Sequence, residues 1–203
     1  WMSSNANPGA RRLAFEELLA HRLCMRRFKA LFAQRRAPVL KEGSELIKRF
    51  EGSLPFKLTA SQRQASAEIM ADLMTSTPML RLLQGDVGSG KTLVAALSSL
   101  RCLASGFQVA LMAPTEILAE QHCASFRAWF EPFGIKVGWL SGKTRAAERK
   151  QVLQQLLSGE CQLLIGTHAL FQDQVLYKSL GLIIVDEQHR FGVHQRLSLR
   201  DKG

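Results

Sequence analysis

The stretch "LLQGDVGSGKTLVA", residues 82–95, decides how the rest of the chain is interpreted. Residues 85–92 match the pattern G-x-x-x-x-G-K-[S/T] of a phosphate-binding loop. The apolar run 79–84 predicts a strand before this loop, and residues 91–104 predict a helix after it. Glycines free backbone N–H groups to surround phosphate oxygens, and the helix N-terminus also favours an anion. The candidate nucleotide-contacting residues are Gly85, Asp86, Val87, Gly88, Ser89, Gly90, Lys91 and Thr92.

A second stretch, "LGLIIVDEQHR" at residues 180–190, ends an apolar run on two adjacent carboxylates. Ligands of α/β sheets lie at the carboxyl ends of strands, so Asp186 and Glu187 can lie beside the phosphate loop. We expect Lys91 to contact the β- and γ-phosphates, and Thr92 and Asp186 to hold Mg²⁺, Asp186 through water. Glu187 would orient or deprotonate the attacking water. The alternative is an ordinary polar loop after a strand.

Strands and helices alternate from residue 58 onwards. Further strands are predicted at 108–113, 136–140, 161–166 and 181–186, and helices at 60–74, 115–130 and 144–157. This alternation predicts an α/β fold with a mostly parallel sheet covered by helices on both faces. Ahead of it, residues 11–36 predict one or two helices and 44–50 a short one. We divide the chain into a basic helical linker segment, 1–51, and a nucleotide-binding lobe, 52–203.

Charge is concentrated in the linker segment. The net charge is +10, and residues 1–51 hold 11 lysines and arginines against 5 acidic residues. This excess favours a polyanionic partner, although a solvated helix surface explains it equally well. The four cysteines are isolated, which favours reduced thiols in a cytoplasmic protein. No apolar run approaches the roughly 20 residues of a membrane span, and no secretory signal begins the chain.

Several motifs together resemble one helicase family. "DEQH", residues 186–189, resembles motif II of superfamily 2 helicases, and "DEQHRFGVHQR", 186–196, is similar to the RecG family of bacterial DNA helicases. "MAPTEILAEQH" (112–122) and "LLIGTHALFQDQV" (163–175) resemble other motifs of that family's first motor lobe. "RRLAFEELLAHRL" (11–23) resembles its helical stretch ahead of the motor. Transcription-repair coupling translocases share much of this pattern, but usually carry Glu at the position of Gln188.

The resemblance implies a RecA-like lobe of an ATP-dependent DNA helicase. Such a protein uses ATP and Mg²⁺, works on forks and Holliday junctions in the bacterial cytoplasm, and is expected to be a monomer. The family's second lobe, with its arginine fingers, and most of its wedge domain are expected to lie outside residues 1–203. We therefore expect these residues alone to hydrolyse ATP poorly, because arginine fingers are typically worth about 10³–10⁵ in rate.

The resemblance also implies roles for single residues. Gln62 is similar to the adenine-reading glutamine of the Q motif, with Phe56 as a stacking partner. Thr59 and Gln62 also fit a capping box, which needs no nucleotide. Gln188 and His189 resemble residues that couple hydrolysis to closure on a second lobe. The residues similar to DNA-backbone contacts are Pro114, Thr115, Gly166, Thr167 and His168.

Two other classes of protein compete with this interpretation. A GTPase or a transporter ATPase would also carry a phosphate loop, but the chain contains neither N-K-x-D nor L-S-G-G-Q. A non-catalytic nucleic-acid-binding module would explain the basic segment. It would leave Lys91, Thr92, Asp186 and Glu187 without a purpose.

Overall fold

A four-stranded parallel sheet forms the centre of the computed structural model, which describes residues 12, 15–20, 22–23 and 36–187. Its order is β2-β3-β1-β4. The strands are β1 (Gln108–Met112), β2 (Val137–Leu140), β3 (Leu163–Gly166) and β4 (Leu180–Val185). All three neighbouring pairs are parallel, and Val109 of β1 lies opposite both Leu163 and Leu182. The predicted parallel α/β sheet is confirmed.

The helices lie close to their predicted positions. They are α2 (Ser44–Ser53), α3 (Ala60–Leu73), α4 (Lys91–Ala104), α5 (Glu116–Phe130) and α6 (Ala146–Ser158). Two short 3₁₀ helices follow α5 and β3, namely η1 (Glu131–Phe133) and η2 (His168–Phe171). Threonine side chains at positions 59 and 115 accept hydrogen bonds from the first turns of α3 and α5, which fixes where these helices begin. Helix α6 ends at Gly159, whose φ of 85° is favourable for glycine.

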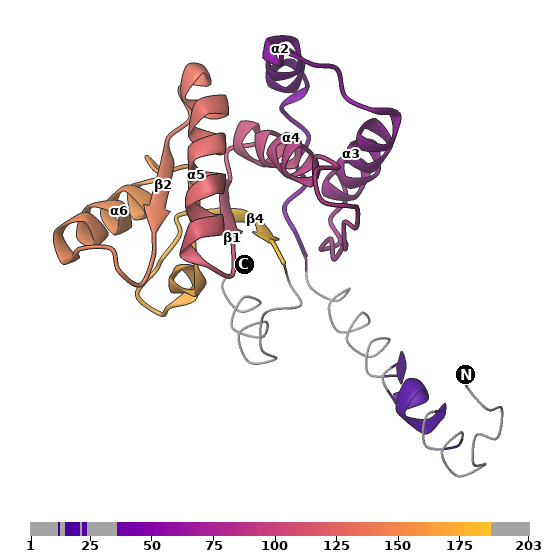
Figure 1. Cartoon of the computed structure of the whole chain (residues 1–203). Helices are drawn as coiled ribbons and strands as arrows, with labels where there is room; N and C mark the ends of the chain where they lie inside the picture. The colour runs from indigo at the N-terminus through magenta and orange to yellow at the C-terminus, as the bar shows by residue number, and fades with distance from the viewer. Residues whose placement is uncertain (1–11, 13–14, 21, 24–35, 188–203) are drawn as a thin grey trace.

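Helices cover both faces of the sheet, as predicted (Figure 1). Alternate residues of each strand point to opposite faces. Leu111 of β1 packs in a core that includes side chains from α2, α3, α4 and α5, whereas Met112 packs in a second core with residues of α6 and η2. All five residues of β1 are buried. The sheet is therefore closed to water on both faces at its centre.

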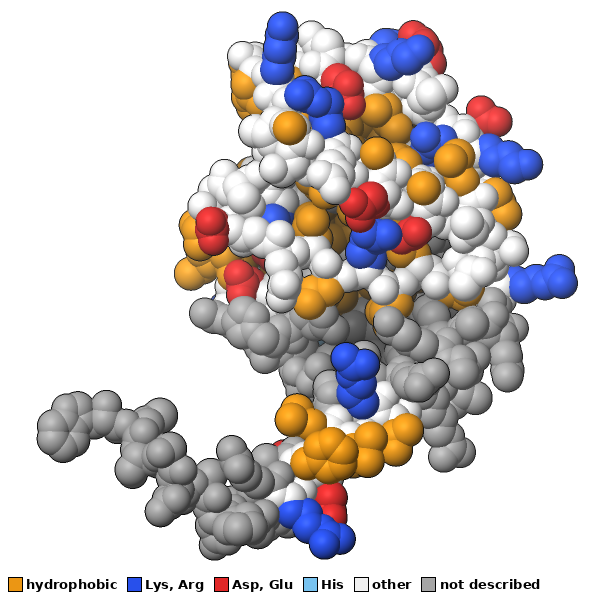
Figure 2. Space-filling model, turned by 90° about the vertical axis from the view of Figure 1, so that its right-hand side faces the viewer, with side chains coloured by type: hydrophobic (Ala, Val, Ile, Leu, Met, Phe, Trp, Pro, Cys, Tyr) orange, Lys and Arg blue, Asp and Glu red, His pale blue; other side chains and the backbone are white. Residues whose placement is uncertain are grey.

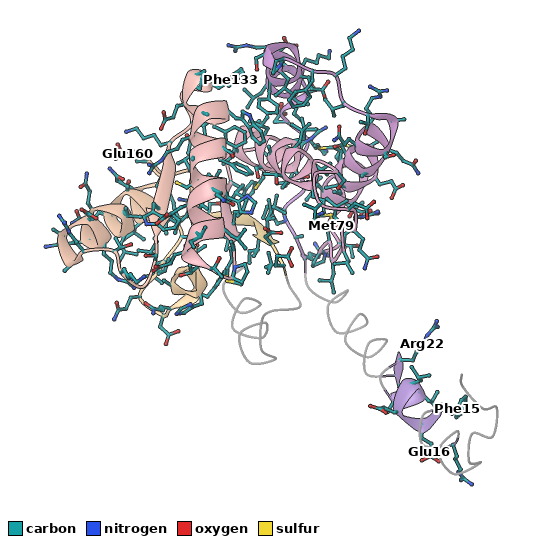
Figure 3. The ribbon with its side chains drawn as sticks, viewed as in Figure 1. Phe15, Glu16, Arg22, Met79, Phe133 and Glu160 are labelled. Atoms are coloured by element: carbon teal, nitrogen blue, oxygen red, sulfur yellow. The ribbon has the colours of Figure 1, made fainter. Side chains whose placement is uncertain are left out.

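An aromatic cluster attaches α2 to the α/β body. Phe50 of α2 is 1% exposed, and its ring lies 5.9 Å from that of Phe130 at the end of α5. Phe133 lies between α2 and this end of α5, with its ring 6.2 Å from Phe50 (Figure 3). Leu40 is also 1% exposed. Residues 40 and 50, which the sequence places in the linker segment, thus share the core of the lobe.

The predicted strand at 79–84 is wrong, because these residues form no ladder with any strand that the structure describes. A strand requires a neighbour for its backbone hydrogen bonds, and β4, at the sheet edge, pairs only with β1. The segment is instead held by Arg81, which donates to Glu68 and Asp72 of α3 at 2.6 and 2.8 Å. Leu80 and Leu82 are 54% and 67% exposed. The phosphate loop consequently follows an irregular segment.

The predicted helical region 11–36 is only partly described. Residues 15–20 are helical and lie apart from the α/β body (Figure 1). Figure 2 shows hydrophobic side chains gathered on this piece, where Phe15 and Leu18 are 64% and 68% exposed. Arginines 26, 27 and 35 lie outside the described residues. Among the helices that the structure describes, none is long and apolar enough to cross a membrane.

The cysteines that can be placed behave as core residues. Cys102, Cys123 and Cys161 are buried and free, which confirms the prediction of isolated thiols for these three. Burial raises the pKa of Cys102 to about 12 and that of Cys161 to about 11. Both thiols therefore stay protonated and unreactive at neutral pH. Cys24 lies outside the described residues.

Candidate functional site

The carboxyl ends of the strands form one continuous edge. The backbone N–H of Ala113 donates to Gly166 O at 3.0 Å, and that of Thr167 donates to Leu140 O at 3.3 Å. On the other side of β1, Asp186 N donates to Met112 O at 2.8 Å. The structure therefore brings together the predicted DNA-contacting loops after β1 and β3 and the acidic pair after β4.

In the phosphate loop, the ammonium group of Lys91 is bound to backbone carbonyl oxygens of the loop itself. Lys91 Nζ donates to Gly85 O at 2.6 Å and to Asp86 O at 2.9 Å. Gly88 and Gly90 have φ values of 79° and 81°, a conformation that suits glycine. No side chain caps α4, and Leu93 N donates to the backbone at Gly90 O, which leaves the N–H groups of Lys91 and Thr92 to face a ligand. Thr92 lies in this turn, where its hydroxyl could reach a metal beside a bound phosphate.

Gln62 connects the start of α3 to the phosphate loop. Its Oε1 accepts from Thr59 N at 2.9 Å and its backbone N–H donates to Thr59 Oγ1, which completes the predicted capping box. Its Nε2 donates to Ser89 O at 2.9 Å. A Cβ at Gly90 would lie 2.2 Å from this Nε2, so only glycine accommodates the contact. Phe56 is 51% exposed, which leaves its ring accessible to a ligand.

Asp186 is held by two hydrogen bonds. His122 Nε2 lies 2.7 Å from Oδ2, and the backbone N–H of Glu187 donates to Oδ1 at 3.0 Å. The hydrogen bond from His122 lowers the pKa of Asp186 below its usual range, and the charge of Lys91 lowers it further. An ionised carboxylate only accepts, so the proton lies on His122 Nε2.

Glu187 has an unusual backbone conformation. Its φ is 50°, the one positive value among the non-glycine residues that the structure describes. Such conformations cost about 1–3 kcal/mol and persist where the surroundings impose them, often at functional sites. The φ of Glu187 sets the direction of its side chain, while its backbone N–H donates to the carboxylate of Asp186.

Most of the candidate DNA-contacting residues have small side chains. Thr115 Oγ1 accepts from Leu118 N at 3.3 Å, and Thr167 is 4% exposed. A Cβ at Gly166 would lie 1.7 Å from Leu140 O, so glycine is required where β3 passes β2. His168, in contrast, is exposed at the start of η2. Backbone groups thus dominate this part of the edge.

Two features of the edge were missed by sequence reasoning. One is His122, whose position two turns into α5 gave no sign of a partner on β4. The other is the loop 141–144 after β2, where Lys143 Nζ lies 2.6 Å from Glu116 Oε2. Its sequence "SGKT" follows a predicted strand, as the other edge loops do, and that signal could have identified it. Gln188 and His189 lie outside the described residues.

Among the described residues, the edge offers few groups that could ligate a metal ion. Within the described part of the chain, no group of three or more His, Cys, Asp or Glu could hold a metal ion. Mg²⁺ in nucleotide sites is commonly held by one or two protein oxygens together with phosphates and water. The Thr92 hydroxyl and the Asp186 carboxylate fit that requirement.

A parallel α/β sheet with a phosphate loop and an acidic pair at one strand edge defines the class of RecA-like nucleotide-binding motor lobes. The chain belongs to the DEAD/DEAH box helicase family, whose model matches residues 59–201.

Relatives within that class agree with the predicted resemblance to RecG. The chain is 52% identical to "ATP-dependent DNA helicase RecG" of Haemophilus influenzae over 202 residues, covering 100% of this chain and 29% of the relative. It is also 52% identical to the protein of that name from Escherichia coli K12, with the same coverage. A solved structure described as RecG bound to a three-way DNA junction has a TM-score of 0.82 and 45% identity, covering 90% of this chain and 25% of that one. The chain thus spans about 29% of the length of these relatives.

Proposed function

We propose that this chain is the ATP-binding motor lobe of a RecG-type DNA helicase that remodels branched DNA such as stalled forks and Holliday junctions. One observation carries the proposal: the acidic pair and the loops resembling DNA contacts share one edge of the sheet, and α4, which the phosphate loop precedes, packs against β1 and β4. Hydrolysis beside the acidic pair would therefore move the loops after β1 and β3. The names of the relatives and the junction-bound structure support the choice of branched DNA.

When ATP binds, Lys91 of the phosphate loop would exchange its hydrogen bonds to the protein for hydrogen bonds to the phosphates. Lys91 would release Gly85 O and Asp86 O and donate to the β- and γ-phosphates instead. Gln62, already bonded to Ser89 O, would read the adenine edge, and Phe56 would stack on the ring. The other nucleotide contacts would come from the glycines and N–H groups of residues 85–92.

The two carboxylates of the acidic pair, Asp186 and Glu187, would have different roles. Asp186 and Thr92 would hold Mg²⁺, which when bound neutralises charge on the phosphates. Glu187 would orient the water or take its proton, since general-base catalysis needs a carboxylate within hydrogen-bond reach of that water. Its strained backbone fixes the position of the side chain relative to Asp186.

The loops at the other end of the edge would hold the DNA backbone. Pro114 and Thr115 after β1 and residues 166–168 after β3 would contact phosphates without reading bases, which suits a motor that must move along any sequence. Residues 52–203 would be the first of two lobes, and residues 1–51 would connect it to a wedge domain. Gln188 and His189 would couple hydrolysis to closure of the lobes.

Measuring ATP hydrolysis by the full-length protein that carries this chain, with and without three-way junction DNA, tests the proposal. We expect junction DNA to stimulate hydrolysis and ATP to bind in preference to GTP. Glu187→Gln should retain ATP binding and lower kcat at least about 100-fold, because only the water-activating carboxylate is lost. Glu148→Gln, an exposed site on α6, is the matched control. Hydrolysis that ignores DNA, or that survives Glu187→Gln, would refute the assignment.

A further inference from the structure

The contact between His122 and Asp186 extends beyond the motifs that define the site. His122 belongs to α5 and Asp186 follows β4, so the bond joins elements that are 64 residues apart in sequence. Its length of 2.7 Å is short for a hydrogen bond from nitrogen, as expected when the acceptor is charged. The side chains are 16% and 32% exposed, so water competes only partly for the bond.

The two hydrogen bonds on Asp186 fix the plane of its carboxylate. His122 holds Oδ2 and the Glu187 N–H holds Oδ1, so rotation of the group would break both. Each carboxylate oxygen carries two lone pairs, so each keeps capacity for a further donor or metal-bound water. Without His122, only the local backbone contact would remain, and the carboxylate could rotate.

We propose that His122 is a positioning residue of the metal site: it fixes the orientation of the Asp186 carboxylate and ties that carboxylate to α5. This inference rests on the proposed function, because it presupposes that Asp186 serves Mg²⁺. Outer hydrogen-bond partners of metal-binding groups typically contribute 10- to 100-fold in metal affinity or activity.

The position of His122 on α5 gives the contact a second consequence. Thr115, in the loop that would contact DNA, is the N-cap of the same helix, and buried Cys123 and Phe126 anchor that helix in the core. Helix α5 thus connects the loop at Thr115, which would contact DNA, to the carboxylate of Asp186, which would serve the metal. A shift of α5 when the loop engages phosphate would displace Asp186 through His122.

The test uses the full-length protein with three substitutions. His122→Ala removes the donor, whereas His122→Gln keeps one, since the glutamine Nε2 can take the place of the imidazole Nε2. Gln121→Ala changes the exposed neighbour on α5 and serves as control. For each protein we would titrate Mg²⁺ in two measurements, ATP binding by calorimetry and junction-stimulated hydrolysis.

We expect His122→Ala to raise the half-saturating Mg²⁺ concentration about tenfold in both measurements. Hydrolysis should recover at saturating Mg²⁺, which damage to the fold would not permit. His122→Gln should stay within about twofold of wild type, and Gln121→Ala should match it. An unchanged or lower Mg²⁺ requirement in His122→Ala, or no rescue by glutamine, would overturn the inference.

A nucleotide-free measurement completes the test. In a double-mutant cycle of His122→Ala and Asp186→Asn, the effects on the unfolding equilibrium should be coupled by severalfold if the bond exists in solution. Independent effects would remove the physical basis of the inference. If the wild-type protein neither binds nor hydrolyses ATP, the proposed function fails together with this inference. If the wild-type protein does both and His122→Ala has the wild-type Mg²⁺ requirement, this inference alone fails.

Discussion

Replacing Gln62 by glutamate separates its two structural roles. A glutamate at this position can still accept from Thr59 N, because glutamate and glutamine both complete a capping box. It cannot donate to Ser89 O, which the native Nε2 contacts at 2.9 Å. The change therefore removes the link to the phosphate loop while keeping the cap of α3.

The expected loss can be worked from that single bond. A lost hydrogen bond costs about 0.5–1.5 kcal/mol, and leaving a carboxylate near a carbonyl oxygen and a bound triphosphate adds to this. A total of about 1–2 kcal/mol corresponds to ATP affinity roughly 5- to 30-fold weaker. Because the bond to Ser89 O is present without nucleotide, the free energy of unfolding should also fall, by about 0.5–1.5 kcal/mol. Gln62→Ala, which loses the cap too, should cost about 1 kcal/mol more.

Calorimetric titration with ATP and urea unfolding followed by circular dichroism measure the two effects. Gln154→Glu on α6 introduces the same charge at an exposed site and controls for it. Wild-type ATP affinity in Gln62→Glu would leave Gln62 as a helix cap alone. Equal destabilisation by glutamate and alanine would show that the cap itself does not tolerate the change.

Two further substitutions test other parts of the edge. Lys91→Ala should weaken ATP binding roughly 10- to 150-fold, since a hydrogen bond to a charged group contributes about 1.5–3 kcal/mol, while the protein still folds. Lys150→Ala, exposed on α6, is its control, and unchanged affinity by calorimetry would contradict the phosphate-loop assignment. Gly166→Ala should lower the free energy of unfolding by about 3 kcal/mol, because its Cβ would lie 1.7 Å from Leu140 O. Gly142→Ala has open space and should be neutral; similar denaturation midpoints for both would refute the steric argument.

Local patterns were sufficient for most of the fold. The glycines before Lys91 end the phosphate loop and α4 begins where predicted, because both features depend on neighbouring residues. The capping box at Thr59 was predictable for the same reason. The apolar segment 79–84 has the composition of a strand, but strand formation depends on a partner that periodicity does not supply. That prediction therefore failed.

The candidate site was likewise predictable only where it depends on local sequence. Asp186 could be predicted as a strand-end carboxylate because it directly follows an apolar run. Its partner His122 could not, because the contact requires the strand order β2-β3-β1-β4 and the face of α5 that lies over the end of β4. Neither the strand order nor the orientation of α5 can be predicted from helical periodicity or from the motif around His122.

The central place of β1 has a consequence for how the chain reaches this fold. Val109 must pair with Leu163 on one side and Leu182 on the other, and both partners are distant in sequence. Loop closure must precede these contacts, so the folding rate should be low for the size of the chain. During synthesis, β1 leaves the ribosome well before either partner and exposes a strand of four apolar residues after Gln108, with free edges. Such an intermediate is prone to aggregate, so refolding yield should depend on protein concentration long before native stability does.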